Sequence, residues 1–480
     1  MDVLVMAGQL ILGLSILVGL HELGHLLTAK LFGMRVEQYS IGFPPKIFGF
    51  KMGETEYSLG AVPLGGYVKI TGMIDESLDT EYLGREPQPY EFRAKPAWQR
   101  LIVMMGGIIV NVITGIVIFV ILLYMFGRDY LPSNQAQHGI VAHSYAQQIG
   151  LRTFDRIIRI NGEPYDSFHD VMGKEVLLGR DNYYTVVRGN DTVTVDIPNS
   201  LIGVINKNKN RYIDPYPATP FTVGNVQQPE VSPGAFHAFL RKIGLEAQPD
   251  TVPAYFADIK PGDRILSVNG QPVKFYHEFQ AMINKSVNQT VTLQIERPDS
   301  VNGALAGMQT VATRVKVKPF PGEKKSKDRP RGYIGIVPKL PLKWEHVDYT
   351  FGMAMQEGPS TAFGVVVDNV RAFGKIFRRE VSASESLSGP IGIAQIYGST
   401  WDWERFWSLT ALLSMILAFM NFLPIPALDG GHVMFLTYEI VSGRSPSTRF
   451  LEVAQKVGMV ILLSLMVFAF FNDIFKNFFS

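Results

Sequence analysis

The residues best suited to chemistry are His21, Glu22 and His25, which stand in the segment His-Glu-Leu-Gly-His. Residues four apart share one face of an α-helix, so both imidazoles can hold a single metal ion. Zinc accepts His nitrogen and lowers the pKa of its bound water toward about 7. Glu22 can then take a proton from that water and pass it to a leaving amine. The alternative is a helix end whose histidines merely face water, although ionisable residues inside apolar spans are usually functional.

A catalytic zinc needs a third protein ligand, and the candidate is Asp429. It is the acidic residue at the end of the third long apolar segment, and Pro424 and Pro426 just before it should break the helix. His21 lies about 27 Å of helix beyond Val3, which is close to the thickness of the apolar membrane core. The third segment crosses the membrane in the same direction, so Asp429 at its end should lie at a similar depth in the membrane. Asp429 as a simple helix cap remains an alternative, and His432 is a weaker spare ligand.

The composition predicts a membrane protein that carries these residues on apolar helices. Of 480 residues, 47% are hydrophobic and only 18% are charged, which excludes a disordered chain. The net charge of +2 gives no field for nucleic acid, and the absence of cysteine excludes disulfides and Cys-ligated metal. Four transmembrane helices are predicted within these ranges: 1–30, 98–127, 401–435 and 450–475. The apolar stretches of the second and fourth, about 101–126 and 457–471, contain no charged residue, and Asn111 and Thr114 are the polar residues that stand out there.

Basic residues near the span ends predict the orientation. They gather in the 31–97 connection and recur as Arg444 and Arg449 in the short loop before the last span. We therefore expect both connections in the cytoplasm and both termini outside it. The long 127–400 region should lie outside as well, with the active site near the cytoplasmic side.

The long region contains an internal repeat, since Asp155–Gly162 (DRIIRING) recurs as Asp263–Gly270 (DRILSVNG). Each copy is typical of a short strand that ends in an Asn-Gly turn, with further alternating strands downstream. We expect two β-rich domains at 128–222 and 223–320, followed by a linker with amphipathic helices at 321–400. Both copies resemble bacterial PDZ domains. They either contact peptides or substrate ectodomains, or simply block access as structural domains.

The whole chain resembles the site-2 protease family of intramembrane zinc metalloproteases. Its HExxH motif matches at 21–25, and its N-x-x-P-x-P-x-x-D-G motif matches from Asn421 to Gly430. The Gly-rich segment 60–68 and the Ser-Gly-Pro stretch 388–393 also match, as does a pair of PDZ-like domains between the second and third spans.

This resemblance implies one Zn²⁺ per chain, held by His21, His25 and Asp429 with Glu22 as the catalytic base. It also implies a polytopic α-helical membrane protein of the bacterial inner membrane, with a cytoplasmic, membrane-associated β-hairpin at 31–97. The substrates would be single-span membrane proteins already shortened on the outer side, such as an anti-sigma factor or signal-peptide remnants. The implied substrate-binding residues are Asn421, Pro424, Pro426, Gly60, Gly65 and Gly66.

Two other classes of function compete with the protease. A non-enzymatic membrane scaffold could recruit peptides through the PDZ-like domains, but it would require a damaged catalytic set. A metal transporter would need ionisable residues along several spans, which the second and fourth spans do not offer.

Overall fold

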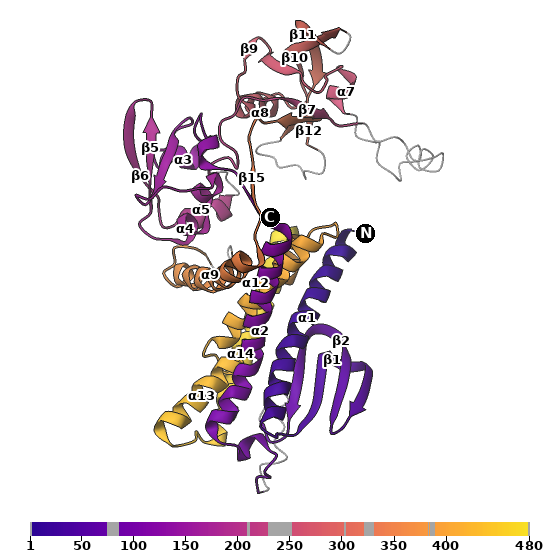
Figure 1. The fold of residues 1–480 in the computed structure, drawn as a ribbon, viewed down its shortest axis with the longest axis vertical. Helices are drawn as coiled ribbons and strands as arrows, with labels where there is room; N and C mark the ends of the chain where they lie inside the picture. The colour runs from indigo at the N-terminus through magenta and orange to yellow at the C-terminus, as the bar shows by residue number, and fades with distance from the viewer. Residues whose placement is uncertain are drawn as a thin grey trace, which may run out of the picture. The chain divides into compact units, whose positions relative to one another are not determined.

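The computed structural model describes residues 2–73, 86–208, 212–228, 252–301, 304–320, 331–382, 384 and 389–478. The chain forms two compact units: Met1–Asp129 with His346–Ser480, and Tyr130–Glu345. The first unit carries the long apolar helices, and the second is β-rich. Figure 1 shows the elements of both units.

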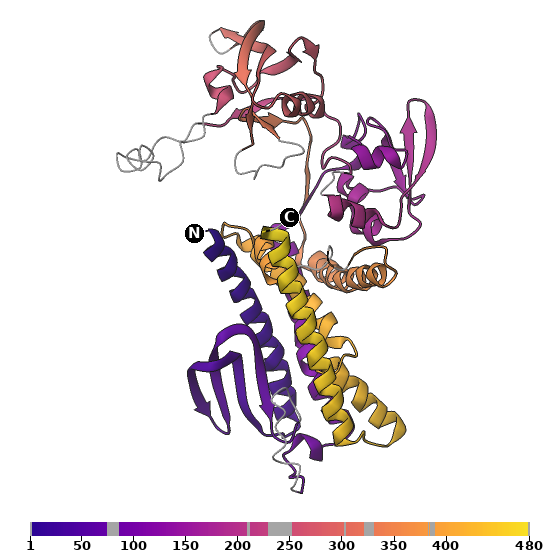
Figure 2. The ribbon, with the colours of Figure 1, turned by 180° about the vertical axis from the view of Figure 1, so that it is seen from behind.

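Among the described residues, four helices of the first unit are long and apolar enough to cross a membrane. They are α1 (Asp2–Leu31), α2 (Ala97–Phe126), α12 (Trp403–Phe422) and α14 (Thr448–Phe478). Helix α2 packs against both α1 and α12, and the two chain termini lie at the same end of this helix group (Figures 1 and 2). The predicted polytopic membrane protein is therefore confirmed, and the chain also contains β-rich regions.

Helices α1 and α2 cross with their backbones nearly in contact. A Cβ atom at Gly24 would lie 2.3 Å from the carbonyl oxygen of Gly106, and one at Gly106 would lie 2.6 Å from that of Gly24. Small residues at a crossing allow helices to approach closely in a bilayer. This crossing lies immediately beside the two histidines of α1.

The third span ends earlier than the predicted 435. Helix α12 stops at Phe422, a turn follows, and a separate helix α13 (Asp429–Ser442) begins. Pro424 and Pro426 cause the break because proline lacks an N–H donor and disfavours helical backbone in the residue before it. Asp429 is therefore the first residue of a new helix.

A small antiparallel sheet packs against α1. Strand β1 (Val36–Met52) and strand β2 (Thr55–Ile70) are both long and bent, so that 36–41 pairs with 66–70 on one side and 56–59 on the other. The Tyr39 hydroxyl donates to the carbonyl oxygen of Gly19 at 2.8 Å. This bond anchors the sheet to α1 two residues before His21.

Two further helices of the first unit pack against these spans. Helix α9 (Phe351–Phe377) packs on α2 and α12, and the short α11 (Pro390–Tyr397) packs on α1 and α14. Asp473 of α14 is only 2% exposed and accepts hydrogen bonds from the backbone N–H groups of Gly389 and Gly392 at 2.9 Å each. The prediction overlooked this ionisable residue in the last span. It caps α11, which is a structural role that adds no ion path.

The internal repeat is a structural repeat. In the first copy, strand β4 (Arg156–Ile160) pairs with β5 (Tyr183–Arg188), which pairs with β6 (Asp191–Asp196). In the second, β8 (Arg264–Val268) pairs with β10 (Thr290–Val301), which pairs with β11 (Ala304–Lys316). Each copy encloses its own apolar core.

The repeated residues make the same contacts in both copies. Asp155 is paired with Arg188 at 2.7 Å, and Asp263 with Arg297 at 2.8 Å. Asn161 has a positive φ of 53° and opens an Asn-Gly turn, as Asn269 does with a φ of 52°. The sequence repeat is thus accounted for by a buried acid–arginine pair and a left-handed turn.

The second β-rich body extends beyond the predicted boundary at 320. Strand β14 (Ile336–Lys339) pairs with β7 (Thr222–Val226), and Ile334 lies in the second core. Residues 331–339, which were predicted to belong to a linker, are therefore part of this body. They add a strand beside β7 and contribute Ile334 to its apolar core. At the edge of the first unit, Asp129 and His346 approach to 2.6 Å, so the chain leaves and re-enters that unit at adjacent points.

Candidate active site

Three side chains that are far apart in sequence meet on the helices of the first unit. His21 and His25 of α1 are 8% and 6% exposed, and Asp429 begins α13. The Oδ2 atom of Asp429 lies 3.1 Å from His21 Nε2 and 3.4 Å from His25 Nε2, and the two Nε2 atoms are 3.3 Å apart. Among the described residues, this is the group of His and acidic side chains close enough to hold a metal ion.

The spacing of these donors fits zinc. Tetrahedral zinc with ligands at about 2.0–2.1 Å has edges of about 3.3 Å between ligand atoms. All three observed separations, 3.1, 3.3 and 3.4 Å, match such an edge. The set offers one face of a tetrahedron and leaves the fourth position for water or substrate.

One face of α2 forms the wall behind the two imidazoles. The carbonyl oxygen of Val103 accepts a hydrogen bond from His25 Nδ1 at 2.8 Å. One turn later, a Cβ at Gly107 would lie 2.5 Å from both His21 Cε1 and His25 Nε2. A further turn on, Asn111 Nδ2 lies 3.1 Å from His21 Nδ1. None of these three residues was predicted as part of the site, although the polar amide of Asn111 inside an apolar span was a signal for function.

Glu22 faces the sheet. A Cβ at Gly66 would lie 3.2 Å from Glu22 Cγ and 2.7 Å from Val18 Cγ1. The 66–70 segment is therefore the part of the sheet that runs directly beside Glu22. This places a strand edge next to the carboxylate that the sequence predicted as a base.

Asn421 also reaches the histidines. It is 9% exposed, and its Nδ2 lies 3.2 Å from His21 Nε2. The following turn holds Pro424 and Pro426, and Gly430 sits so close that a Cβ there would lie 2.2 Å from the carbonyl oxygen of Leu423. The turn is thus packed tightly onto the start of α13, which sets the position of Asp429.

Gly60 and Gly65, which were predicted to bind substrate, lie where packing within the protein leaves no room for a side chain. A Cβ at Gly60 would lie 2.3 Å from the carbonyl oxygen of Phe43, and one at Gly65 would lie 2.3 Å from the Phe43 ring. Both therefore permit close packing within the sheet. This packing alone accounts for glycine at both positions, and it neither supports nor opposes their predicted contact with substrate.

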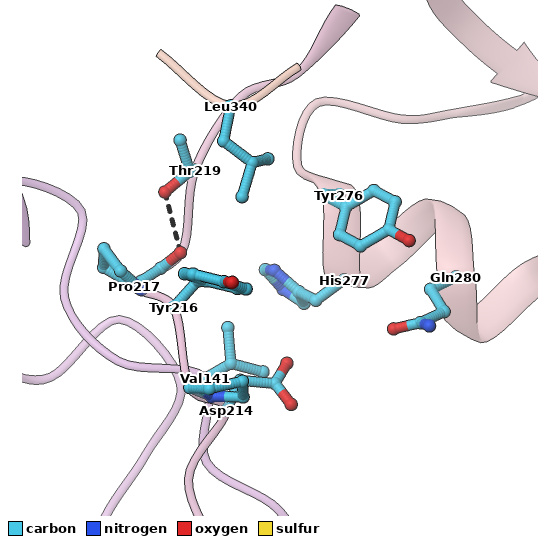
Figure 3. A pocket seen from close by; sticks show the side chains of 10 residues that line it. Val141, Asp214, Tyr216, Pro217, Thr219, Tyr276, His277, Gln280 and Leu340 are labelled. Carbon is cyan, nitrogen blue, oxygen red and sulfur yellow. Dashed lines mark hydrogen bonds between the residues drawn. The ribbon is translucent and has the colours of Figure 1, made fainter. Parts of the chain in front are cut away.

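The β-rich unit contains a hollow of about 260 Å³ between its two bodies (Figure 3). Val141 and Asp214 line one side, and His277 and Gln280 of α8 (Tyr276–Lys285) line the other. Asp214 is paired with His143 at 2.8 Å. These groups lie outside the HExxH site and have no metal spacing.

Comparison with known proteins agrees with this geometry. The model of peptidase family M50 matches residues 9–465. The chain belongs to peptidase family M50. The match includes all three clustered side chains, the whole second and third candidate membrane helices, and most of the first and last.

Related proteins cover nearly the full length of this M50 peptidase. Protease RseP of Yersinia pestis is 29% identical and covers 98% of this chain and 99% of its own length. Regulator of sigma-E protease RseP of Salmonella typhimurium is 28% identical over 96% of this chain and 97% of its own. A Neisseria meningitidis protein provisionally named a zinc metalloprotease is 28% identical over 97% of both chains.

These findings confirm the predicted enzyme class. This M50 peptidase is an intramembrane zinc metalloprotease, and zinc is its cofactor. The scaffold alternative required a damaged catalytic set, whereas His21, His25 and Asp429 lie together intact.

Proposed function

We propose that this M50 peptidase cleaves peptide bonds inside the membrane segments of single-span proteins, using one Zn²⁺ held by His21, His25 and Asp429. The observation that carries the proposal is the donor triangle with edges of 3.1, 3.3 and 3.4 Å, formed by two buried imidazoles of an apolar helix and the partly buried carboxylate of Asp429. Such ligands inside a span are costly and are kept for function.

Glu22 is the proposed general base. When bound, zinc supplies a Lewis acid that acidifies water and polarises the carbonyl of the bond to be cut. Glu22 accepts a proton from the attacking water on its carboxylate and returns it to the nitrogen of the leaving amine. The helices around the site exclude bulk water, which strengthens these interactions.

The sheet beside Glu22 is the proposed substrate platform. A transmembrane helix satisfies its peptide groups internally, so it must unwind before a carbonyl becomes accessible. An unwound segment can add as a strand to the 66–70 edge, whose Gly66 lies next to Glu22. In this arrangement Asn421, with Pro424 and Pro426 shaping its turn, hydrogen-bonds the substrate backbone. Gly60 and Gly65 keep the sheet compact.

The proposed setting is the bacterial inner membrane. Both termini and the two PDZ-like bodies lie outside the cytoplasm, and the sheet is a cytoplasmic, membrane-associated hairpin, as the basic residues of the 31–97 connection favour. The PDZ-like bodies act as a size filter that admits substrates already shortened on the outer side. A regulator of sigma-E among the relatives supports an anti-sigma factor as one substrate.

The test is cleavage of a single-span model protein with a short outer segment by purified enzyme in detergent. We expect Glu22→Gln to lose at least about 100-fold in rate while retaining zinc, because the base is removed and the ligands remain. A chelator should abolish wild-type cleavage, and added zinc should restore it. Normal cleavage by the zinc-loaded variant would overturn the assignment of Glu22.

A further inference from the structure

Helix α2 presents two different hydrogen-bonding groups to the two histidines, at residues one turn either side of Gly107. The Val103 carbonyl accepts from His25 Nδ1, which fixes the proton of that ring on Nδ1 and leaves the Nε2 lone pair facing Asp429. No side chain is needed for this, because the carbonyl belongs to the backbone of α2. His25 is thus ready to bind a metal through Nε2.

His21 depends instead on a side chain. Its Nδ1 lies 3.1 Å from Asn111 Nδ2, while the Asn111 Oδ1 atom is buried and has no hydrogen-bond partner among the described residues. Asn111 is completely buried. The amide nitrogen of Asn421 lies 3.2 Å from Nε2 of the same ring. A neutral imidazole has a single acceptor nitrogen, so it cannot accept hydrogen bonds from both amides.

Zinc binding through Nε2 requires one particular tautomer. The proton must then sit on Nδ1, where it needs an acceptor rather than a donor. A half-turn of the Asn111 amide exchanges its oxygen and nitrogen without changing its volume, and brings the unpartnered Oδ1 to the Nδ1 proton.

We propose that Asn111 is a positioning residue that selects the metal-binding tautomer of His21 by accepting a hydrogen bond from its Nδ1. This inference rests on the proposed zinc site and deepens it. Asn111 is well held for the task, since the Ser414 hydroxyl of α12 donates to its backbone carbonyl at 2.8 Å. Gly107, which has no side chain, leaves room for both imidazole rings to pack directly against α2.

The experiment measures zinc affinity by competition with a chelator, using the purified full-length protein in detergent. Asn111→Leu has similar volume and no acceptor, and we expect it to bind zinc about 10–100-fold more weakly than wild type. Asn111→Asp keeps an acceptor oxygen in either protonation state and should restore most of that affinity. Thr114→Val is the matched control, because it replaces a polar group by an apolar one of similar volume on the same helix, three residues beyond Asn111, and it should bind zinc normally.

A second readout separates positioning from simple packing. With Co²⁺ in place of zinc, the visible absorption reports the ligand geometry, and we expect a changed spectrum in Asn111→Leu and a wild-type spectrum in Asn111→Asp. Should Asn111→Leu fail to fold, Asn111→Ala serves in both measurements with the same expectation. Wild-type affinity and spectrum in the folded Leu or Ala variant would overturn the proposal, as would an Asp variant no better than Leu.

The zinc site and the role of Asn111 can be tested separately. If wild-type protein bound no zinc, or kept it after loss of His21, the proposed metal centre itself would be wrong. If wild type bound one zinc through His21 and the Asn111 variants bound it equally well, only the role of Asn111 would be wrong.

Discussion

At the residue scale, the site is defined by the positions and orientations of its donor atoms. His21, His25 and Asp429 supply three atoms at tetrahedral spacing, and each histidine has a second contact on α2. Contacts of that kind fix ring orientation and tautomer and contribute substantially to metal affinity. We therefore expect the proposed chemistry to depend also on neighbours that are neither ligands nor bases.

Asp429 supplies the only carboxylate of the donor triangle in the described structure. We expect Asp429→Ala to weaken zinc binding by more than about 100-fold, since loss of a ligand should exceed the loss of a residue behind a ligand. Metal analysis of the purified variant measures this directly. Full zinc occupancy together with full activity would exclude Asp429 from the site.

Gly107 tests whether space next to the histidines is essential. A methyl group there would lie 2.5 Å from His25 Nε2, so a ring or helix α2 must shift. We expect Gly107→Ala to lower zinc affinity about 10-fold or more. Gly8→Ala is the matched control, because a Cβ at Gly8 meets nothing within 4 Å and the change also lies in a membrane helix. Equal zinc affinity in both variants would contradict this role.

At the element scale, the site is assembled by helix ends and crossings. The Gly24–Gly106 crossing brings α1 against α2, and the break after Phe422 allows α13 to begin at Asp429. A Cβ at Gly458 of α14 would lie only 1.6 Å from the carbonyl oxygen of Pro426. Helix α14 therefore packs directly against the irregular segment between α12 and α13 and helps to hold it in place.

The junction within the β-rich unit should respond to pH. Burial lowers the pKa of His277 below its ordinary value of 6.5, against opposing pulls from Glu278 and Asp214. The ring packs against Phe154 and Phe275, where a charge is unfavourable. Because the unfolded chain binds this proton more readily, stability is fully present above about pH 6.5 and falls as the pH drops below it.

Thermal unfolding of wild type and His277→Gln between pH 8 and 5 tests this expectation. Wild type should lose more stability than the variant on acidification, since the variant has no imidazole to protonate. Parallel losses in the two proteins would show that His277 does not govern the junction.

At the scale of the whole molecule, the β-rich unit is an insertion into the membrane unit. The chain leaves at Asp129 and returns at His346, and these residues are hydrogen-bonded at 2.6 Å. The membrane unit can therefore be closed by a short loop across that point. Its helices, sheet and donor triangle all lie outside the 130–345 insertion.

We expect replacement of residues 130–345 by a short Gly/Ser loop to leave zinc binding intact. If the inserted bodies filter substrates by size, the shortened enzyme should also cleave a model substrate with a full outer domain, which wild type rejects. Cleavage assays with long and short substrates measure this. A zinc-loaded variant that cleaves the short substrate and still rejects the long one would contradict the filter.

Sequence alone was enough for the donor set and the spans. His21, Glu22 and His25 have a fixed helical spacing, Asp429 follows two prolines, and long apolar runs need a membrane, so local rules were sufficient. Tertiary structure decided the rest. The partners on α2, the packing reasons for Gly60 and Gly65, the extension of the second β-rich body to residue 339 and the capping role of Asp473 all depend on contacts between distant segments. Such contacts arise from close packing of whole elements, and no local periodicity encodes them.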